Sequence, residues 1–484
     1  MAYDAKSNSR NDFFIGGEWV APASDRRFQL INAATEEVIG SVPEGVEADV
    51  DRAVAAARYA FEKSSWATAT PAERAATMGR FAEALQKRSG EIARAVSMQN
   101  GMPLALSETF EGAFPIGLLA YYADLAANMQ LEEKRPSQMG RETIVSRTPI
   151  GVVAAIVPWN FPVVLAMSKI APALAAGCTL VIKPSPGTVL DSYLLADAAA
   201  EAGIPAGVIN WVAADRAVGA YLVSHPGIDK VAFTGSTAAG RAIAKVCGEL
   251  LRPVTLELGG KSAAIILDDA NLDIVMQGLP MASLMNNGQT CFSCTRILAP
   301  VSRYKETVDA IAAMASSLKV GDPLDHATQV GPMASSAHRE RVESYIVKGK
   351  SEAKLVAGGG RPKGLDRGWF VQPTVFSDVE NSYAIAREEI FGPVLAVIPY
   401  KDEAEAIRIA NESVYGLGGS VWSTDDGRAR KVAAGVQTGT IGINGYVPAI
   451  GSPFGGIKAS GLGRELGPEA LSGYQQLKAT YVMG

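Results

Sequence analysis

Cysteine and histidine are scarce in this chain, which contains four cysteines and three histidines among its 484 residues. Four cysteines are too few for the disulfide framework of a secreted protein, so we expect a reducing, cytoplasmic setting. The motif His-Glu-x-x-His is absent, and the Cys-x-x-Cys at 291–294 has no second cysteine or histidine pair nearby. A zinc hydrolase is therefore not expected, and neither is another metal site.

Excess basic charge and long apolar runs are also missing. The chain has 45 lysines and arginines against 50 aspartates and glutamates, a net charge of −5. A protein that binds nucleic acid or an anionic membrane needs a basic field, so neither partner is expected. No apolar run reaches the roughly 18 residues of a spanning helix, and residues 1–12 lack the hydrophobic core of a signal peptide.

The length suits about three domains, and the apolar pattern divides the chain. The first 150 residues are predicted to be mainly helical, whereas strands and helices alternate from residue 151 onward. Predicted strands lie near 152–157, 179–183, 208–212, 230–233 and 254–257. Predicted helices lie near 162–176, 189–202, 218–224 and 237–250. Unbroken runs of valine, isoleucine and leucine indicate a parallel sheet covered on both faces. A second alternating series, from 262 to about 446, predicts another α/β unit.

Polar residues stand where four of the predicted strands end, which is where parallel sheets bind ligands. Asn160 follows the first strand, and its amide either donates to a developing oxyanion or forms a turn between prolines. Lys183 ends the second strand and either bonds ribose hydroxyls or reaches solvent. Gly235 opens a strand-to-helix turn that suits a pyrophosphate, although a tight structural turn explains it equally well.

Glu257 closes the fifth strand and precedes two glycines. Partial burial would raise its pKa toward the neutral range that a general base requires. The alternative is a structural carboxylate held by Lys261 or by a backbone amide. A phosphate-binding P-loop is excluded because Thr255 stands where that pattern needs glycine.

Cys291 lies among small and polar residues and is a candidate nucleophile. A lone cysteine is more often a buried, space-filling residue, which is the expectation for Cys178 and Cys247. None of the three histidines supports a histidine-based mechanism. The base that serves a Cys291 nucleophile is therefore predicted to be Glu257.

Seven segments in this order resemble the aldehyde dehydrogenase superfamily: 158–162, 183–185, 233–240, 257–261, 288–291, 388–393 and 452–456. The similarity extends over essentially the whole chain, from 14–19 to 474–482. It implies an α/β fold of three domains. These are a Rossmann-like cofactor domain (1–126 and 150–258), an α/β catalytic domain (259–450) and a small bridging oligomerisation sheet (127–149 and 451–484). It also implies a homo-oligomer, either a dimer or a tetramer.

The resemblance further implies a mechanism. Cys291 attacks the aldehyde carbon, and the oxyanion of the thiohemiacetal is held by the Asn160 amide and the Cys291 backbone N–H. Hydride transfer to the nicotinamide leaves a thioester, which is hydrolysed by water that Glu257 activates. Lys169 matches a lysine with a supporting role near the oxyanion.

The remaining site residues follow from matching positions. The predicted cofactor-binding residues are Trp159, Lys183, Ser185, Gly219, Phe233, Gly235, Ser236, Gly240, Leu258, Gly259, Glu389 and Phe391. The predicted substrate-pocket residues are Phe161, Val164, Leu165, Ser168, Met285 and Phe292.

NAD is the expected cofactor. Pro186 stands where an acid that binds the ribose 2′-hydroxyl is common, which leaves NADP as an alternative. No arginine stands beside Lys183 to select a 2′-phosphate, so NAD is favoured.

The expected substrate is a medium or large hydrophobic aldehyde, which is aliphatic, terpenoid or aromatic. The pocket positions contain no arginine or lysine, and this disfavours semialdehydes that bear a carboxylate. Ser168 replaces a bulky aromatic and predicts a wide channel. The alternatives are a coenzyme A-acylating or semialdehyde dehydrogenase and a non-catalytic structural relative.

Overall fold

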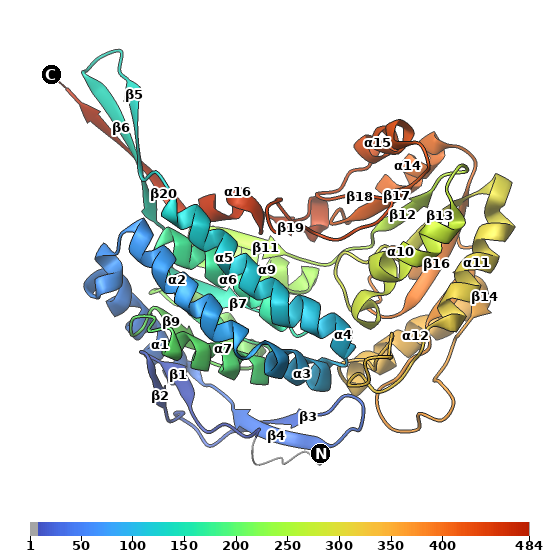
Figure 1. Cartoon of the computed structure of the whole chain (residues 1–484), viewed down its shortest axis with the longest axis horizontal. Coiled ribbons are helices and arrows are strands. Elements are labelled where there is room, and N and C mark those ends of the chain that lie inside the picture. The colour runs from blue at the N-terminus through green and yellow to red at the C-terminus, as the bar shows by residue number, and fades with distance from the viewer. Residues whose placement is uncertain (1–7, 484) are drawn as a thin grey trace.

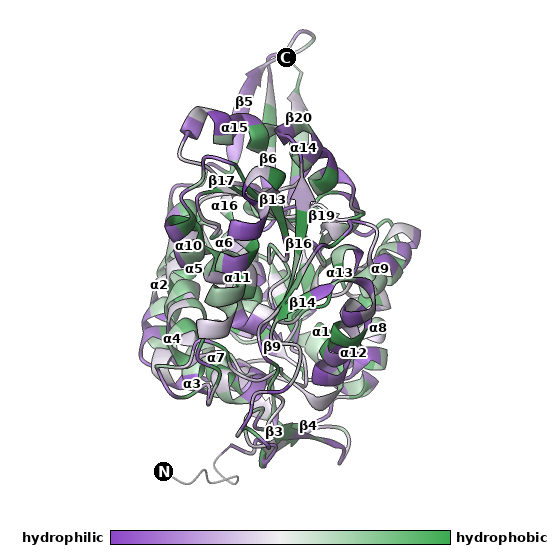
Figure 2. Ribbon diagram, turned by 90° about the vertical axis from the view of Figure 1, so that its right-hand side faces the viewer, coloured by the Kyte–Doolittle hydropathy of each residue, from purple (hydrophilic) through white to green (hydrophobic). Residues whose placement is uncertain are grey.

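The computed structural model describes residues 8–483. Two α/β lobes face each other, and a narrow antiparallel arm projects from the first of them (Figure 1). Hydrophobic residues concentrate in central strands such as β16, whereas surface helices such as α12 and α15 carry many hydrophilic residues (Figure 2). Within the described residues, no helix combines the length and the apolar character needed to cross a membrane.

The first lobe is built on an eight-stranded sheet in the order β19-β11-β10-β7-β8-β9-β1-β2. Its five central strands are parallel: β7 (Val152–Ile156), β8 (Thr179–Lys183), β9 (Ile209–Trp211), β10 (Lys230–Thr234) and β11 (Val254–Glu257). Nearly every residue of these strands is buried, which is why the unbroken apolar runs predicted them. The connecting helices agree closely with prediction: α6 (Pro162–Ala176), α7 (Leu190–Glu201), α8 (Arg216–Ser224) and α9 (Thr237–Glu249).

The N-terminal region is less helical than predicted. Its helices are α1 (Glu47–Lys63), α2 (Pro71–Gln86), α3 (Ser89–Asn100), α4 (Leu104–Ser107) and α5 (Phe114–Ala127). Four short strands precede them: β1 (Phe13–Ile15), β2 (Glu18–Val20), β3 (Arg27–Ile31) and β4 (Val38–Pro43). Strands β1 and β2 form a hairpin that joins the first sheet where Phe14 lies opposite Trp211 of β9, and β3 and β4 form a separate two-stranded sheet. Strands this short leave little local signal in the sequence.

The second lobe contains a seven-stranded sheet in the order β14-β15-β16-β13-β12-β17-β18. The strands are β12 (Ala263–Ile266), β13 (Arg296–Pro300), β14 (Lys354–Ala357), β15 (Thr374–Ser377), β16 (Val394–Tyr400), β17 (Gly419–Trp422) and β18 (Gly442–Ile443). The helices are α10 (Leu272–Leu284), α11 (Tyr304–Ser317), α12 (Ser336–Glu352), α13 (Ala384–Arg387), α14 (Glu403–Asn411) and α15 (Asp426–Gly435). All neighbouring strands are parallel except β14 and β15.

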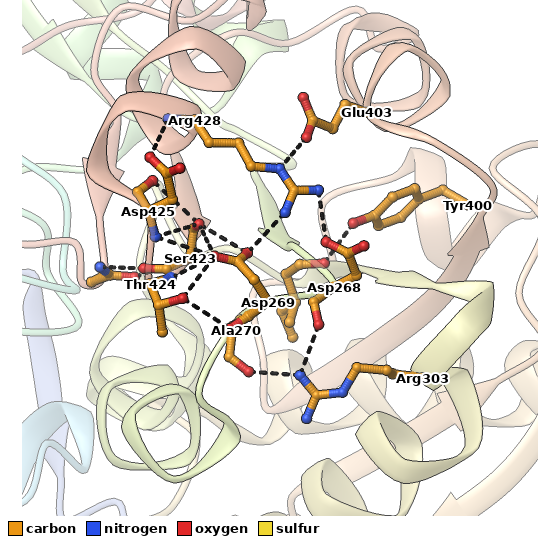
Figure 3. Close-up of polar contacts among 12 residues, drawn as sticks. Asp268, Asp269, Ala270, Arg303, Tyr400, Glu403, Ser423, Thr424, Asp425 and Arg428 are labelled. Atoms are coloured by element: carbon orange, nitrogen blue, oxygen red, sulfur yellow. Dashed lines mark hydrogen bonds and ion pairs between the residues drawn. The ribbon is translucent and has the colours of Figure 1, made fainter.

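A polar network joins the loops that follow β12 and β17 (Figure 3). The Asp269 carboxylate accepts hydrogen bonds from the hydroxyls of Ser423 and Thr424 and from the backbone N–H groups of Thr424 and Asp425. Arg428 adds an ion pair of 3.3 Å. Burial acts to raise the pKa of Asp269, but the bonds from Ser423 and Thr424 outweigh burial and lower the pKa. This carboxylate is a structural tie between two loops.

The projecting arm is a three-stranded antiparallel sheet in the order β20-β6-β5. Its strands are β5 (Glu132–Pro136), β6 (Glu142–Pro149) and β20 (Gln475–Val482). The chain between 451 and 474 does not enter the arm. Instead, β19 (Gly461–Leu462) joins the first sheet beside β11, and α16 (Gly467–Ser472) leads into β20.

Candidate active site

Two cavities meet between the lobes, and they share two lining residues, Asn160 and Cys291. The first is a cleft of about 800 Å³ at the carboxyl ends of β7, β10 and β11. The second is a tunnel of about 610 Å³ with mostly apolar walls. A ligand in each cavity would bring the two ligands together beside the Cys291 thiol.

The cleft is lined by seven of the predicted cofactor-binding residues: Trp159, Gly235, Ser236, Leu258, Gly259, Glu389 and Phe391. Five others lie outside this lining: Lys183, Ser185, Gly219, Phe233 and Gly240. Phe233 packs its ring against Gly235, and Gly240 contacts the Leu258 side chain.

Ser236 caps the N-terminus of α9 by accepting a hydrogen bond from the Ala239 N–H. The first turn of this helix therefore begins at the cleft, where its positive end suits an anionic group.

Lys183 lies deeper, under Gly219, and is almost fully buried. Its ammonium donates to the carbonyls of Pro184 (3.1 Å) and Ala214 (2.8 Å), which leaves one N–H free for a hydroxyl. Burial lowers the pKa of Lys183 to about 8. These groups fit a dinucleotide, because the N-terminus of α9 at the cleft suits a phosphate and Lys183, outside the cleft lining, has an N–H to offer to a hydroxyl.

Glu389 lies against the backbone of the 259–260 turn. Its Oε1 accepts a hydrogen bond from the Gly260 N–H at 3.0 Å. A Cβ added at Gly259 would lie 2.3 Å from Oε2, so a side chain there would displace the carboxylate. Burial raises the pKa of Glu389 to about 7.

Helix α12 holds the segment that carries Glu389 and Phe391. The His338 imidazole lies 2.7 Å from the Phe391 carbonyl oxygen, so Nε2 carries the hydrogen of this bond. Arg341 donates to the Glu389 carbonyl at 2.7 Å. Burial lowers the pKa of His338 to about 4, so the ring is neutral at physiological pH. Phe391 adopts a positive φ of 65°, and these contacts support that conformation.

Cys291 faces both cavities from a loop that follows two asparagines with positive φ, Asn286 and Asn287. The Thr290 hydroxyl donates to the Met285 carbonyl at 2.8 Å and closes this loop. Desolvation by the surrounding protein raises the pKa of the Cys291 thiol, and the nearby carboxylates Glu389 and Glu257 raise it further. The thiol is therefore protonated at neutral pH, and its reaction requires a base.

Glu257 is 2% exposed, and neither of its carboxylate oxygens has a hydrogen-bond partner among residues 8–483. Burial raises the pKa of Glu257 well above its ordinary value, and the Glu465 carboxylate adds to this shift, while Lys169 and Arg464 oppose it. A Cβ added at Gly455 would lie 2.5 Å from Oε1, so glycine at that position makes room for the carboxylate. An unpaired buried carboxylate with a raised pKa is suited to accept and release protons.

Lys169 lies beneath the site and is fully buried. Its ammonium donates to Glu465 Oε1 at 2.6 Å and to the Thr234 hydroxyl at 2.7 Å. The Ser168 hydroxyl donates to Glu465 Oε2 at 2.8 Å. Lys169 and Ser168 thus neutralise and orient the carboxylate that borders the tunnel.

The tunnel wall includes all six predicted substrate residues: Phe161, Val164, Leu165, Ser168, Met285 and Phe292. The wall also includes residues that the sequence did not predict: Phe110, Phe114, Thr290, Pro448, Phe454, Glu465 and Leu466. Thr290 lies directly before Cys291, and the others come from the 104–127 helical region and from two loops near the C-terminus.

A family comparison accounts for this arrangement. The model of the aldehyde dehydrogenase family matches residues 19–480. The chain belongs to that family.

The relatives of this aldehyde dehydrogenase align with it almost end to end. It is 61% identical to a geranial dehydrogenase from Castellaniella defragrans, over 97% of this chain and 98% of that protein. It is 42% identical to a 3-succinoylsemialdehyde-pyridine dehydrogenase from a Pseudomonas species, over 98% of each. An aldehyde dehydrogenase from Mycobacterium tuberculosis complexed with NAD+ superposes with a TM-score of 0.96, at 48% identity and 98% coverage of both chains. A mutant of aldehyde dehydrogenase C from Pseudomonas syringae, solved with NAD+ and octanal, superposes with a TM-score of 0.95. That pair shares 40% identity, and the alignment covers 99% of this chain and 98% of the other.

These findings confirm the predicted family, the α/β fold and the enzyme class, an NAD(P)-dependent aldehyde dehydrogenase. The predicted cofactor agrees with solved relatives that contain NAD+.

Sequence reasoning also missed the roles of the polar residues Glu465, His338 and Arg341. Each acts on a segment far away in the sequence, so no local pattern marks it.

Proposed function

We propose that this aldehyde dehydrogenase oxidises medium-sized hydrophobic aldehydes, aliphatic or terpenoid, to carboxylic acids with NAD. The apolar tunnel that ends at Cys291 carries this proposal. Burying a hydrocarbon chain there contributes roughly 25 cal/mol per Å² of apolar surface removed from water. The relatives named for geranial and crystallised with octanal support the same substrate class.

The residues divide the chemistry as follows. The Cys291 thiol loses its proton to Glu257, directly or through water, and the sulfur attacks the carbonyl carbon. The Asn160 amide donates to the oxygen that becomes negatively charged. After the hydride leaves the carbon, a thioester joins the acyl group to Cys291. Glu257 releases this first proton to solvent and then accepts a proton from the water that attacks the thioester. The Cys291 sulfur leaves as a thiolate, which regains a proton to restore the thiol.

NAD, when bound, supplies the hydride acceptor. Trp159, Ser236, Glu389 and Phe391 line the cleft that would hold it. Lys183 offers its free N–H to a ribose hydroxyl. Pro186 leaves the 2′-position without a carboxylate, so the ratio of kcat/KM for NAD and NADP tests the preference. A strong preference for NADP would contradict this part of the proposal.

An aldehyde panel tests the substrate class. Geranial, octanal, benzaldehyde and succinic semialdehyde are each supplied with NAD, and the absorbance of reduced cofactor is followed. We expect geranial and octanal to have the highest kcat/KM. The tunnel wall offers no lysine or arginine to the carboxylate of succinic semialdehyde, and it carries the acidic residue Glu465. Succinic semialdehyde turned over faster than octanal would overturn the proposal. Cys291→Ala controls for background oxidation.

Adding coenzyme A to the same assay separates hydrolysis from acylation. Water is the expected acyl acceptor because Glu257 is present and unpaired. An acyl-coenzyme A product would instead assign the protein to the acylating type.

We also propose that the arm mediates assembly into a dimer or tetramer. Its strand β20 is an edge strand with exposed Leu477 (65%) and Tyr481 (71%). Exposed apolar side chains on a sheet edge favour a protein partner. Replacing both with lysine is expected to lower the mass measured by light scattering.

A cytoplasmic setting completes the proposal and is supported by the four free thiols.

A further inference from the structure

Three buried residues with amide side chains form a closed ring of hydrogen bonds beside the candidate active site. The Asn160 side chain donates to the backbone carbonyl of Gln289 at 3.0 Å. The Gln289 side chain donates to the backbone carbonyl of Asn100 at 3.2 Å. The Asn100 side chain donates to the backbone carbonyl of Asn160 at 3.0 Å, which closes the ring.

The ring joins three segments that are distant in the sequence. Asn100 is the last residue of α3, Asn160 follows β7, and Gln289 lies two residues before Cys291. The three side chains are at most 3% exposed. The ring therefore ties the amide donor and the nucleophile loop to one helix of the first lobe.

Further bonds hold the members of the ring in place. Asn100 also donates to the Trp159 carbonyl at 3.1 Å, and its Oδ1 accepts the Met102 N–H at 2.9 Å. Gln289 Oε1 accepts the Ala334 N–H at 2.9 Å. A carboxamide is planar, so fixing one N–H of Asn160 on Gln289 also fixes the direction of the other. That second N–H is the one left for an oxyanion beside Cys291.

We propose that Asn100 is a positioning residue that orients the Asn160 amide toward the oxyanion. This inference rests on the proposed function, because it assumes that an oxyanion forms at Cys291. Asn100 lines neither cavity, so it acts through Asn160 and does not touch the ligand. A purely structural role, in which the ring only satisfies buried amides, is the competing explanation.

A double-mutant cycle separates these roles. The variants are Asn100→Ala, Asn160→Ala and the double variant, each assayed with octanal and NAD. Gln99→Ala is the matched control. It removes a buried amide one residue earlier on α3, where Gln99 accepts from the backbone N–H groups of Val189 and Leu190 and does not contact Asn160. The melting temperature of every variant is measured.

We expect Asn160→Ala to lower kcat by about 10²–10³-fold, the loss typical of one oxyanion donor. Asn100→Ala should lower kcat by about 10-fold through misplacement of that donor, with KM for NAD within about twofold. In the double variant, Asn100→Ala should add no further loss, because the group that it positions is gone. Gln99→Ala should lower the melting temperature but keep kcat within about twofold.

An additive loss in the double variant, or full kcat in Asn100→Ala, would overturn the inference. A second substrate distinguishes this outcome from failure of the proposed function. Attack of Cys291 on p-nitrophenyl acetate also builds an oxyanion, but it needs neither an aldehyde nor a cofactor. Suppose that wild type releases p-nitrophenolate, the variants show the expected non-additive losses with this substrate, and wild type oxidises no aldehyde. That result would refute the proposed function but would still support the role of Asn100.

Discussion

Glu257 ends strand β11 and Asp269 follows the next strand, β12, and the protein surrounds these two carboxylates in opposite ways. Asp269 accepts hydrogen bonds from two hydroxyls and two backbone N–H groups, and these bonds lower its pKa. Glu257 is buried without a hydrogen-bond partner in the described part of the chain, and burial raises its pKa. A satisfied carboxylate stabilises the fold, whereas an unsatisfied one keeps its capacity to exchange protons.

Replacing Glu257 by glutamine should have the largest effect. The variant keeps the shape of the side chain but cannot accept a proton, so kcat should fall by about 10²–10⁴-fold. Its melting temperature should stay the same or rise, because a buried acid without partners is removed. Steady-state kinetics and calorimetry test both parts. A variant with near-normal turnover would show that Glu257 is not the base.

Asp269→Asn is the matched change in the structural carboxylate. The amide group would face N–H donors, so unfolding should become easier by about 1–3 kcal/mol. The kcat per folded molecule should be unchanged, since Asp269 lines neither cavity and, unlike Glu257, is not among the carboxylates that act on the Cys291 thiol. Denaturant unfolding measures the first quantity. Unchanged stability would mean that the network in Figure 3 contributes little to the fold.

The two variants should also respond to pH with opposite signs. The lowered pKa of Asp269 means that its stabilisation is complete above the unfolded value of about 3.9 and is lost as pH falls through the folded pKa. The advantage of wild type over Asp269→Asn should therefore shrink in acid. The raised pKa of Glu257 means that the folded state holds its proton more tightly than the unfolded state, so wild type loses stability as pH rises above about 4.3. The advantage of Glu257→Gln should therefore grow with pH. Melting curves from acid to neutral pH measure both slopes, and parallel slopes would contradict the assignment.

Glu389 lies between these extremes and should show the smallest effect. It accepts one hydrogen bond, from the Gly260 N–H, and burial raises its pKa to about 7. If Glu389 binds a ribose of NAD as proposed for this cleft, its ionised form would accept hydrogen bonds from the hydroxyls more strongly, so KM for NAD should fall by about 2–5-fold as pH rises past the pKa. In Glu389→Gln this dependence should disappear while kcat/KM for the aldehyde changes less. The same pH dependence in the variant would place the titrating group elsewhere.

Much of the fold could be predicted because its strands are marked locally. Strands β8 and β11 have the predicted bounds, and the unbroken apolar run 180–182 of β8 is typical of a strand that is covered on both faces. Strands β1 to β4 could not be predicted in the same way, because they are short and lie near the surface as the hairpins β1–β2 and β3–β4, without the long apolar run of a central strand. The six predicted tunnel residues lie in or beside motifs that resemble the family. Phe110 and Glu465 lie outside those motifs and reach the tunnel through folding alone.

The sequence by itself determined the chemistry that is available: a thiol, an acid, an amide and a set of apolar side chains beside them. Their environment was decided only by the tertiary structure. Burial shifts the pKa of Glu257, and the backbone carbonyl of Gln289 orients the Asn160 amide. Lys169 pairs with Glu465, to which the Ser168 hydroxyl also donates. The physical reason is that desolvation and hydrogen bonding depend on neighbours in space, and those neighbours come from every part of the chain.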